Sequence, residues 1–297
     1  MLYIFLMLTE VLNEFYYHNL MENNQPLVSV VISTYNIEKY IESTLLSVIN
    51  QTYQNLEILI IDDSSTDSTL KIIERLAASD DRIKYIKINH TGEPAIPRNI
   101  GIREAAGEFI AFLDHDDIWV KNKLEQQIKY FKKFPDAVFI YSASVSFGDV
   151  NIFSPLYEVL PLIFRAAKSK DDLIKIGNTI TCSSVIVKAK YLKMTGGFDE
   201  DPKLRGIDDY DLWIRLSEQG NFYFVPRIHV KYRIHSFQAS GSWEKRNTRL
   251  KNLAAKRSLN LPMYKMHRHK PILKFVRSLL HYANYVLYNI LTIKKQI

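Results

Sequence analysis

Three aspartates and a histidine follow an apolar run in the stretch "EFIAFLDHDDIW". The run Phe109–Leu113 predicts a buried strand, which ends directly in Asp114, His115, Asp116 and Asp117. Carboxylates packed together repel one another and lose hydration, so the arrangement needs an opposing charge. Hard cations such as Mg²⁺ and Mn²⁺ prefer carboxylate oxygens and the phosphate oxygens of substrates. The stretch therefore predicts a divalent metal that bridges the protein and a diphosphate.

Polar side chains also follow two other predicted strands. Val28–Ser33 is a continuous, β-branched run that ends in the sequence "TYN", and Leu56–Ile61 ends in Asp62 and Asp63. A solvated charge run is the usual explanation for a group of acids. Three polar clusters at equivalent strand ends instead favour one shared site, because ligands of open α/β sheets bind beyond the carboxyl ends of the strands.

Strands and helices alternate along the first 120 residues. Further strands are predicted over Ile83–Ile88 and Phe109–Leu113, with amphipathic helices between successive strands. This alternation predicts an α/β fold with a mostly parallel, doubly wound sheet. From about Lys121 the pattern loosens, with helices predicted over 122–134 and 207–220.

Composition indicates a globular protein and favours an anionic partner. The chain has 297 residues, of which 47% are hydrophobic and 24% charged, as in ordinary globular proteins. Its one cysteine, Cys182, excludes an internal disulfide framework and is expected to be a small buried residue of an apolar strand. The net charge of +7 favours an anionic partner. We expect no nucleic acid, because no basic run with interleaved aromatic residues is present.

The two ends of the chain carry apolar segments that leave alternatives open. The run Met1–Leu8 is too short to span a bilayer and has no basic region or cleavage site of a signal peptide. Either translation starts at Met21 or the first twenty residues form a loose helix. Pro271–Ile297 predicts a basic amphipathic helix that lies in the membrane interface or docks on the rest of the protein.

Several motifs together resemble one enzyme family. The stretch "PLVSVVISTYNIEKYIESTLLSVINQTYQNLEILIIDDSSTDSTL" is similar to the opening of family 2 glycosyltransferases with the GT-A fold. Further matches follow in the family's order up to about Ser240: "GEPAIPRNIGI", "GEFIAFLDHDDIW", "GGFDE", "GIDDYDLWIRL" and "YRIHSFQAS". Ser33 departs from the pattern, since proline is common there, but the strand end should stay intact.

The resemblance implies a Rossmann-like nucleotide-diphospho-sugar transferase fold, a mixed, mostly parallel sheet flanked by helices. It divides the chain into an N-terminal extension, 1–25, a catalytic domain, 26–240, and a C-terminal helical segment, 241–297. Within the catalytic domain, 26–120 is expected to bind the nucleotide and 121–240 the acceptor.

The resemblance also implies an activity. This is metal-dependent, inverting transfer of a sugar from a nucleoside diphosphate sugar, with a UDP-sugar favoured. The expected acceptor is a hydroxyl of a growing, lipid-linked glycan of a cell-surface polysaccharide, at the cytoplasmic face of the membrane. Two alternatives stay open: a catalytically silent nucleotide-sugar-binding scaffold, which should have lost its acidic residues, and a nucleotidyltransferase, which normally has a Gly- and Arg-rich phosphate loop.

The donor nucleotide is expected at the ends of the first two strands. Ser33, Thr34 and Tyr35 match the family segment that packs against the base. A carboxylate at Asp62 or Asp63 is expected to accept the imide hydrogen of uracil or thymine. We favour Asp62 for this role and Asp63 for support of the turn.

The diphosphate and metal are expected nearer the fourth strand. Arg98 matches an arginine that approaches the nucleotide, since a guanidinium suits phosphate geometry. Asp116 is expected to bind Mn²⁺ or Mg²⁺ directly, while Asp114 contacts the ribose, the donor sugar or the metal. His115 is counted among the donor-binding residues. His235 either completes the metal shell or is structural.

The general base is expected in the motif "GIDDYDLW". By resemblance the second member of the acidic pair acts, which gives Asp209 the role and makes Asp208 its neighbour. Inverting transfer needs one carboxylate to take the proton of the acceptor hydroxyl. The helix dipole there lowers a carboxylate pKa, whereas a neighbouring acid raises it. Asp211 is better explained as a helix cap, and Asp117 either takes part in the site or caps a helix.

Overall fold

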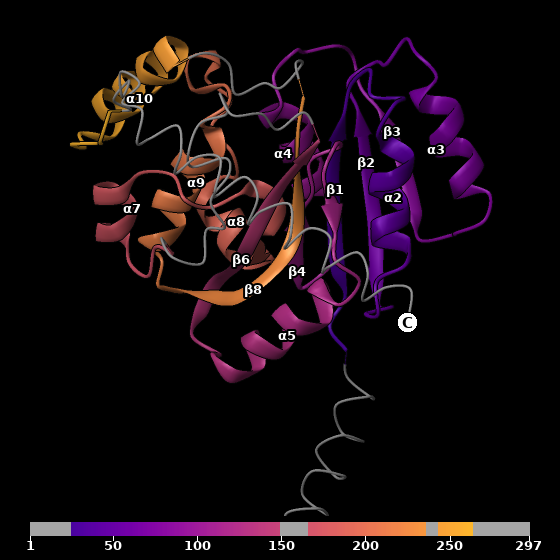
Figure 1. Cartoon of the computed structure of the whole chain (residues 1–297), viewed down its shortest axis with the longest axis horizontal. Coiled ribbons are helices and arrows are strands. Elements are labelled where there is room, and N and C mark those ends of the chain that lie inside the picture. Colours follow the sequence, from indigo (N-terminus) through magenta and orange to yellow (C-terminus); the bar gives the residue numbers. More distant parts are fainter. Residues whose placement is uncertain (1–24, 149–165, 236–242, 264–297) are drawn as a thin grey trace, which may run out of the picture.

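A computed structural model describes residues 25–148, 166–235 and 243–263 (Figure 1). Eight strands form one mixed sheet in the order β3-β2-β1-β4-β7-β6-β8-β5. The strands are β1 Val28–Thr34, β2 Leu56–Asp62, β3 Ile83–Lys87, β4 Phe109–Phe112, β5 Ile118–Trp119, β6 Ala137–Gly148, β7 Ile186–Lys188 and β8 Asn221–Ile234. The helices are α2 Ile41–Ile49, α3 Thr69–Ala77, α4 Ala95–Glu104, α5 Lys123–Lys133, α7 Lys170–Ile176, α8 Ala189–Thr195, α9 Asp208–Ser217 and α10 Trp243–Arg257, with 3-10 turns η2 Cys182–Ser184 and η3 Pro202–Leu204.

Helices cover both faces of the sheet. One apolar core lies between the sheet and α4, α7, α8, α9 and α10, and the other lies between the sheet and α2, α3 and α5. Alternate residues of β1 enter opposite cores, since Val31 belongs to the first and Ile32 to the second. Strands buried on both faces are continuous apolar runs, which is why the sequence reveals them.

The first half of the sheet is parallel, as the sequence predicts. β1 pairs in parallel with β2 and with β4. Thr34 lies opposite Asp62, and Val31 lies opposite Phe112. The carboxyl ends of the three strands therefore meet at one edge, and the polar clusters that follow them lie there together.

The second half of the sheet changes direction. β7 pairs antiparallel with both β4 and β6, and β5 pairs antiparallel with β8. Cys182 is buried, as expected, but it lies in the 3-10 turn η2 before β7 rather than within a strand. The strand that was expected to contain Cys182 is therefore shorter than predicted, since β7 contains only Ile186–Lys188. The α/β fold class and the mixed, mostly parallel sheet are confirmed.

Helix α4 lies close to the sheet, which fixes its position. A Cβ atom on Gly101 would come within 2.4 Å of Cγ1 of Val31, so only glycine fits this helix position without movement of β1. Asn99 then ties α4 to the turn before α9: its Nδ2 donates to the Phe198 carbonyl at 2.9 Å, and its Oδ1 accepts from the Phe198 amide at 2.8 Å. This close packing fixes the position of α4, and with it the position of Arg98, relative to the sheet.

Helix α10 docks on the rest of the protein through ion pairs as well as apolar contacts. Arg257 contacts the fully buried carboxylate of Asp211 at 2.7 Å, and Lys256 contacts Asp199 at 2.8 Å. Asp211 also accepts from Arg215 of its own helix at 2.8 Å, and its bond to Arg257 links α9 to α10, so it does more than cap a helix. No helix in the described ranges is long and apolar enough to cross a membrane. The predicted helix over 271–297 and the N-terminal segment 1–20 lie outside the described residues.

Candidate active site

Arg98 joins two of the predicted acidic residues. Its guanidinium donates to Asp114 at 2.7 Å and to Asp208 at 2.7 Å. The three residues come from α4, from the turn after β4 and from the first turn of α9, which are far apart in sequence. The side chain of Asp208 is 3% exposed, so Arg98 supplies the positive charge that its carboxylate needs in this buried position.

Asp116 pairs with a histidine. Its Oδ2 lies 2.8 Å from Nε2 of His235, at the end of β8. Burial opposes ionisation of Asp116, but the hydrogen bond from His235 and the nearby charges of His115 and His235 outweigh it and lower the pKa of this carboxyl. The structure thus keeps Asp116 ready as an anionic ligand.

The residues proposed for the metal are only partly assembled. Asp116 and His235 lie together, whereas Asp114 is directed to Arg98. In the described ranges no three His, Cys, Asp or Glu side chains are arranged as a metal site. One carboxylate and one imidazole nevertheless suit Mn²⁺ or Mg²⁺ in an enzyme whose substrate is a diphosphate, because phosphate oxygens and water then complete the shell. The residues present fit such an ion.

Asp117 has a structural task in the turn after β4. It is fully buried, accepting from the Ser183 hydroxyl at 2.6 Å and from the Arg233 amide at 2.9 Å. Burial, with Asp116 and Asp114 nearby, raises its pKa. Asp117 therefore ties the turn to η2 and β8 rather than capping a helix. His115 lies in the same turn; its carbonyl accepts from Thr44, and its Nδ1 is buried without a hydrogen-bond partner among the described residues.

Asp209 is set apart from the other carboxylates by its environment. Burial first, and then the charge of Asp208, raise its pKa to about 7, while Arg98 acts in the opposite direction. Its carboxylate faces the amide of Asn178, whose Nδ2 lies 3.3 and 3.4 Å from the two oxygens. The Asn178 Oδ1 accepts from the Ile180 amide at 3.1 Å, which turns the Nδ2 group toward Asp209. A carboxylate with such a pKa changes protonation near neutral pH, as a general base requires.

The two acids after β2 are buried and hold loops together. Asp62 accepts from Thr34, Tyr85 and both the amide and the hydroxyl of Ser65. Asp63 accepts from the backbone amides of Thr91 and Gly92, at 2.7 and 2.9 Å. The support of a turn expected of Asp63 is visible in these bonds. The imide-binding role of Asp62 stays a prediction, and a base would have to displace one of its present donors.

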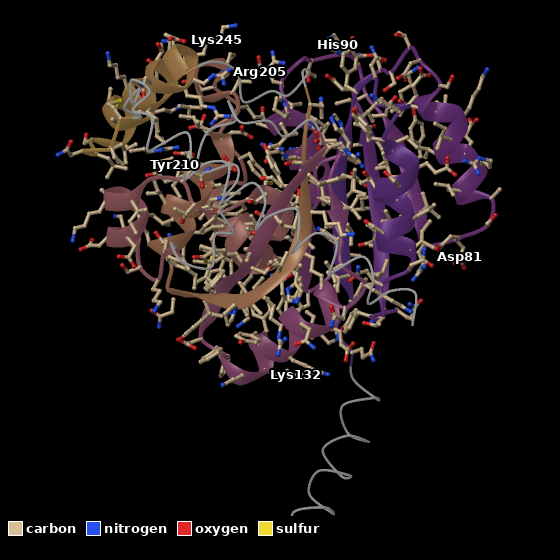
Figure 2. The ribbon with its side chains drawn as sticks, viewed as in Figure 1. Asp81, His90, Lys132, Arg205, Tyr210 and Lys245 are labelled. Atoms are coloured by element: carbon tan, nitrogen blue, oxygen red, sulfur yellow. The ribbon has the colours of Figure 1, made fainter. Side chains whose placement is uncertain are left out.

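Tyr35 lies at the exposed end of β1. Its ring is 40% exposed and stacks on the ring of His90, with centroids 4.4 Å apart. Ser33 is half-buried and Thr34 is buried beneath it. Figure 2 shows His90, which follows β3, at the top of the molecule and Asp81, which precedes that strand, lower down at its right side. The stacked pair therefore belongs to the edge where the carboxyl ends of the strands meet.

Sequence comparisons agree with this geometry. Residues 29–193 match the profile described as "Glycosyl transferase family 2". The chain belongs to this family. TuaG of Bacillus subtilis (strain 168), assigned to teichuronic acid biosynthesis, is 31% identical over 75% of this chain and 86% of its own length. The Escherichia coli enzyme WfaP, a UDP-Glc:alpha-D-GlcNAc-diphosphoundecaprenol beta-1,3-glucosyltransferase, is 34% identical over 76% of this chain and 85% of its own.

Solved structures of other glycosyltransferases share the GT-A fold of this family 2 chain. The mannosyltransferase PcManGT of Pyrobaculum calidifontis, solved with GDP-Man and Mn²⁺, matches with a TM-score of 0.63 and 20% identity over 88% of this chain and 71% of that chain. TarS 1-349 of S. aureus, solved with UDP-GlcNAc, matches with a TM-score of 0.60 and 19% identity over 80% and 68%. At these identities the likeness concerns the fold.

Three residues of this family 2 site were not singled out from the sequence. Ser183 binds Asp117, and Asn178 faces Asp209. Arg233 donates from Nε to the Asp116 carbonyl at 2.7 Å, and its guanidinium lies over the ring of Tyr40. Arg233 lies two residues before His235 in "YRIHS", so its motif was a usable signal. No local pattern distinguishes Asn178 or Ser183 from ordinary loop residues.

Proposed function

We propose that this glycosyltransferase moves a sugar from a UDP-sugar to a hydroxyl of a lipid-linked glycan, with inversion at the anomeric carbon, during assembly of a surface polysaccharide. The observation that carries the proposal is the carboxylate of Asp209. The pKa of this carboxylate is about 7. Asp209 is the sequence neighbour of Asp208, which shares the Arg98 guanidinium with Asp114. A base and a guanidinium that can bind a phosphate, close together at one sheet edge, suit direct sugar transfer.

In the proposed reaction Asp209 takes the proton of the acceptor hydroxyl. The oxygen of that hydroxyl forms a bond to the anomeric carbon from the face opposite the diphosphate. The bond between the sugar and the diphosphate breaks, and the nucleotide leaves with the electron pair. The amide of Asn178 orients the Asp209 carboxylate, and the charge of Asp208 raises its pKa.

Arg98 and Asp114 are proposed to hold the donor. The guanidinium of Arg98 is within hydrogen-bond distance of Asp114, so an arriving donor phosphate and sugar can exchange with this contact. Asp116 and His235 would hold Mn²⁺ or Mg²⁺, which when bound supplies positive charge that stabilises the leaving diphosphate. Tyr35 is proposed to pack against the base.

The acceptor class is proposed from charge and relationship. WfaP uses a diphosphoundecaprenol-linked acceptor, and 76% of this chain aligns with that enzyme. The net charge of +7 suits a phosphorylated acceptor at an anionic membrane surface. We therefore propose work at the cytoplasmic face of the membrane, with the basic segment 271–297 as the membrane contact.

The test is transfer from a panel of UDP-sugars to a synthetic GlcNAc-diphospho-lipid, with Asp209→Asn as the variant. Removal of a general base should lower the transfer rate by about 10²–10⁴-fold. UDP binding should stay near wild type, because the substituted group does not touch the nucleotide. Asp81→Asn, at an exposed position before the amino end of β3, is the matched control and should keep full activity.

Two results would count against the proposal. Near-normal transfer by Asp209→Asn would remove the base assignment. Binding of UDP-sugars by the wild type, without transfer to this or to other diphospho-lipid acceptors, would favour the nucleotide-sugar-binding scaffold.

A further inference from the structure

Two arginines from different elements lie near the acidic pair at the start of α9. The first, Arg205, follows the 3-10 turn η3 and is exposed, whereas Leu204 and Ile207 on either side of it are buried and fix the turn on the core. The next residue, Gly206, donates its backbone amide to the Asp208 carboxylate at 3.0 Å. Arg205 is therefore held three residues before Asp208, in a chain segment tied to that carboxylate.

Helix α10 brings the second arginine, Arg249, to the same place. The helix contacts η3 through Asn252, whose Nδ2 donates to the Lys203 carbonyl at 3.4 Å. Arg249 lies three residues before Asn252, on the same face of the helix. Arg249 is half-buried, and its pKa is lowered, first by burial and then by the charge of Arg205. The two guanidiniums are thus close enough to repel each other.

Two acids act on Arg249 in the opposite direction. The charges of Asp208 and Glu93 favour its cationic form, but burial and the neighbouring arginine outweigh them. Asp208 is itself buried and contacts Arg98 at 2.7 Å. Positive charge on Arg249 is therefore disfavoured on balance, and an anion shared by both arginines would relieve the repulsion between them. A phosphate suits this position, because its oxygens accept paired hydrogen bonds from guanidinium groups.

The arginines belong to the edge of the sheet that carries the site. Figure 2 shows Arg205 and Lys245 at the top of the molecule, as is His90, which follows the carboxyl end of β3. Lys245 is exposed and lies four residues, about one helical turn, before Arg249 on α10. It extends the basic surface formed by the two arginines.

This basic surface lies on the side of the proposed base rather than on that of the donor. Arg98 bridges Asp114, which is proposed to hold the donor, and Asp208, near which the two arginines lie. Asp208 is the sequence neighbour of Asp209, which is proposed to take the proton of the acceptor hydroxyl. An anion bound by the arginines would accordingly belong to the acceptor.

We propose that Arg205 and Arg249 bind the diphosphate of a lipid-linked acceptor and so present its sugar to Asp209. This inference rests on the proposed function and names the residues that distinguish a diphospho-lipid from an uncharged glycan. An acceptor of the kind named for WfaP carries its diphosphate directly on a sugar. The residues that bind the diphosphate must then lie close to the base, as Arg205 does.

The experiment compares two acceptors with the same sugar, a GlcNAc-diphospho-lipid and an uncharged alkyl glycoside of GlcNAc. Arg205→Gln removes an exposed guanidinium and should leave the fold intact. Loss of one hydrogen-bonded charge should raise the KM for the diphospho-lipid about tenfold, with little change in kcat. The kcat/KM for the uncharged glycoside and the affinity for UDP should stay at their wild-type values.

Arg249→Gln should show the same selective loss as Arg205→Gln. Lys251→Ala is the matched control, because it removes a positive charge from an exposed position of the same helix, and it should leave the KM for the diphospho-lipid unchanged. Equal losses with both acceptors, or an unchanged KM in both arginine variants, would overturn the assignment.

Two further results separate this inference from the proposed function. Weaker UDP binding by Arg205→Gln would show that this arginine contacts the diphosphate of the donor, which overturns the inference and leaves the proposed function intact. Absence of transfer by the wild type to any diphospho-lipid would instead contradict the proposed function and this inference together.

Discussion

The acidic residues of the site differ in what neutralises them. Asp114 and Asp208 share Arg98, Asp116 pairs with His235, and Asp117 is held by neutral donors. The protein itself thus supplies much of the opposing charge that the sequence "DHDD" calls for. Asp209 has no cation in direct contact among the described residues, and burial, together with the charge of Asp208, raises its pKa to about 7; burial likewise raises the pKa of Asp117.

The pKa of Asp209 predicts the pH dependence of transfer. A general base acts only when deprotonated, so the rate should rise with pH through about 7 and level off above it. One pH unit below that value, kcat/KM should be about tenfold below its plateau. The measurement is kcat/KM against pH for the wild type. An acid limb near pH 4, the range of an ordinary aspartate, would show that this carboxyl is not the base.

The side-chain amide of Asn178 should lower the pKa of Asp209. Its Nδ2 donates to the Asp209 carboxylate and so favours the charged form. Asn178→Ala should move the acid limb to higher pH while the plateau rate changes less than twofold. Asn122→Ala, at a distant helix start, serves as the control and should leave the profile unmoved. An unshifted limb in Asn178→Ala would limit this residue to a role in loop structure.

The elements that carry the nucleotide half could be predicted from the sequence. β1, β2 and β4 are largely apolar runs, and the polar residues that follow them identify the site edge, whereas β3 at the sheet edge mixes apolar residues with lysines. The mixed second half, in which β6 pairs in parallel with β8 but antiparallel with β7, could not be derived in this way, and two of its strands are very short, since β7 has three residues and β5 has two. Its pairing is set by contacts between distant segments, which local periodicity does not record.

The same limit applies to the side chains of the site. The sequence indicates Arg98 and Asp208 separately, 110 residues apart, but only the fold brings them within 2.7 Å. The saturation of Asp62 by donors from β1, β3 and the following turn likewise depends on strand order. Residue type and motif therefore predict which side chains belong to the site, whereas the packing of the fold decides which partner each side chain contacts.

Arg98 should be needed for the packing of α4 against α9. Its loss leaves Asp208 buried without a cation, and breaking such a pair costs about 3–5 kcal/mol. Arg98→Ala should lower the free energy of unfolding by this amount in denaturant titration. Arg103→Ala, at an exposed position of the same helix, should change it by less than about 0.5 kcal/mol. Equal stability of the two variants would refute the structural role of the bridge.

Helix α10 should depend on Arg257 in a similar way. This residue contacts Asp211, which is fully buried, and hydrogen bonds to a charged group contribute about 2 kcal/mol. Arg257→Ala should reduce the free energy of unfolding by about that amount and speed hydrogen exchange in 243–257. Lys251→Ala, exposed on the same helix, is the control. Unchanged exchange in Arg257→Ala would show that apolar contacts alone dock the helix.

At the scale of the whole molecule, one continuous sheet carries both halves of the site. Strands β1 and β2 position the proposed nucleotide-binding residues, while β8 and α9 deliver His235 and the acidic pair from the second half. Figure 1 shows α9 and β8 to the left of β1 and β2. Because the halves share a sheet, the distance between donor and base is fixed by the fold.

The most direct test of the account is calorimetric titration of UDP with and without Mn²⁺, on the wild type and on Asp116→Ala. The account predicts that Mn²⁺ strengthens UDP binding to the wild type and that the variant loses most of this gain, because Asp116 and His235 are the proposed protein ligands. The control is Asp81→Asn, which should behave as the wild type. UDP binding that is independent of Mn²⁺, or equal in Asp116→Ala, would contradict the placement of the diphosphate at this edge of the sheet.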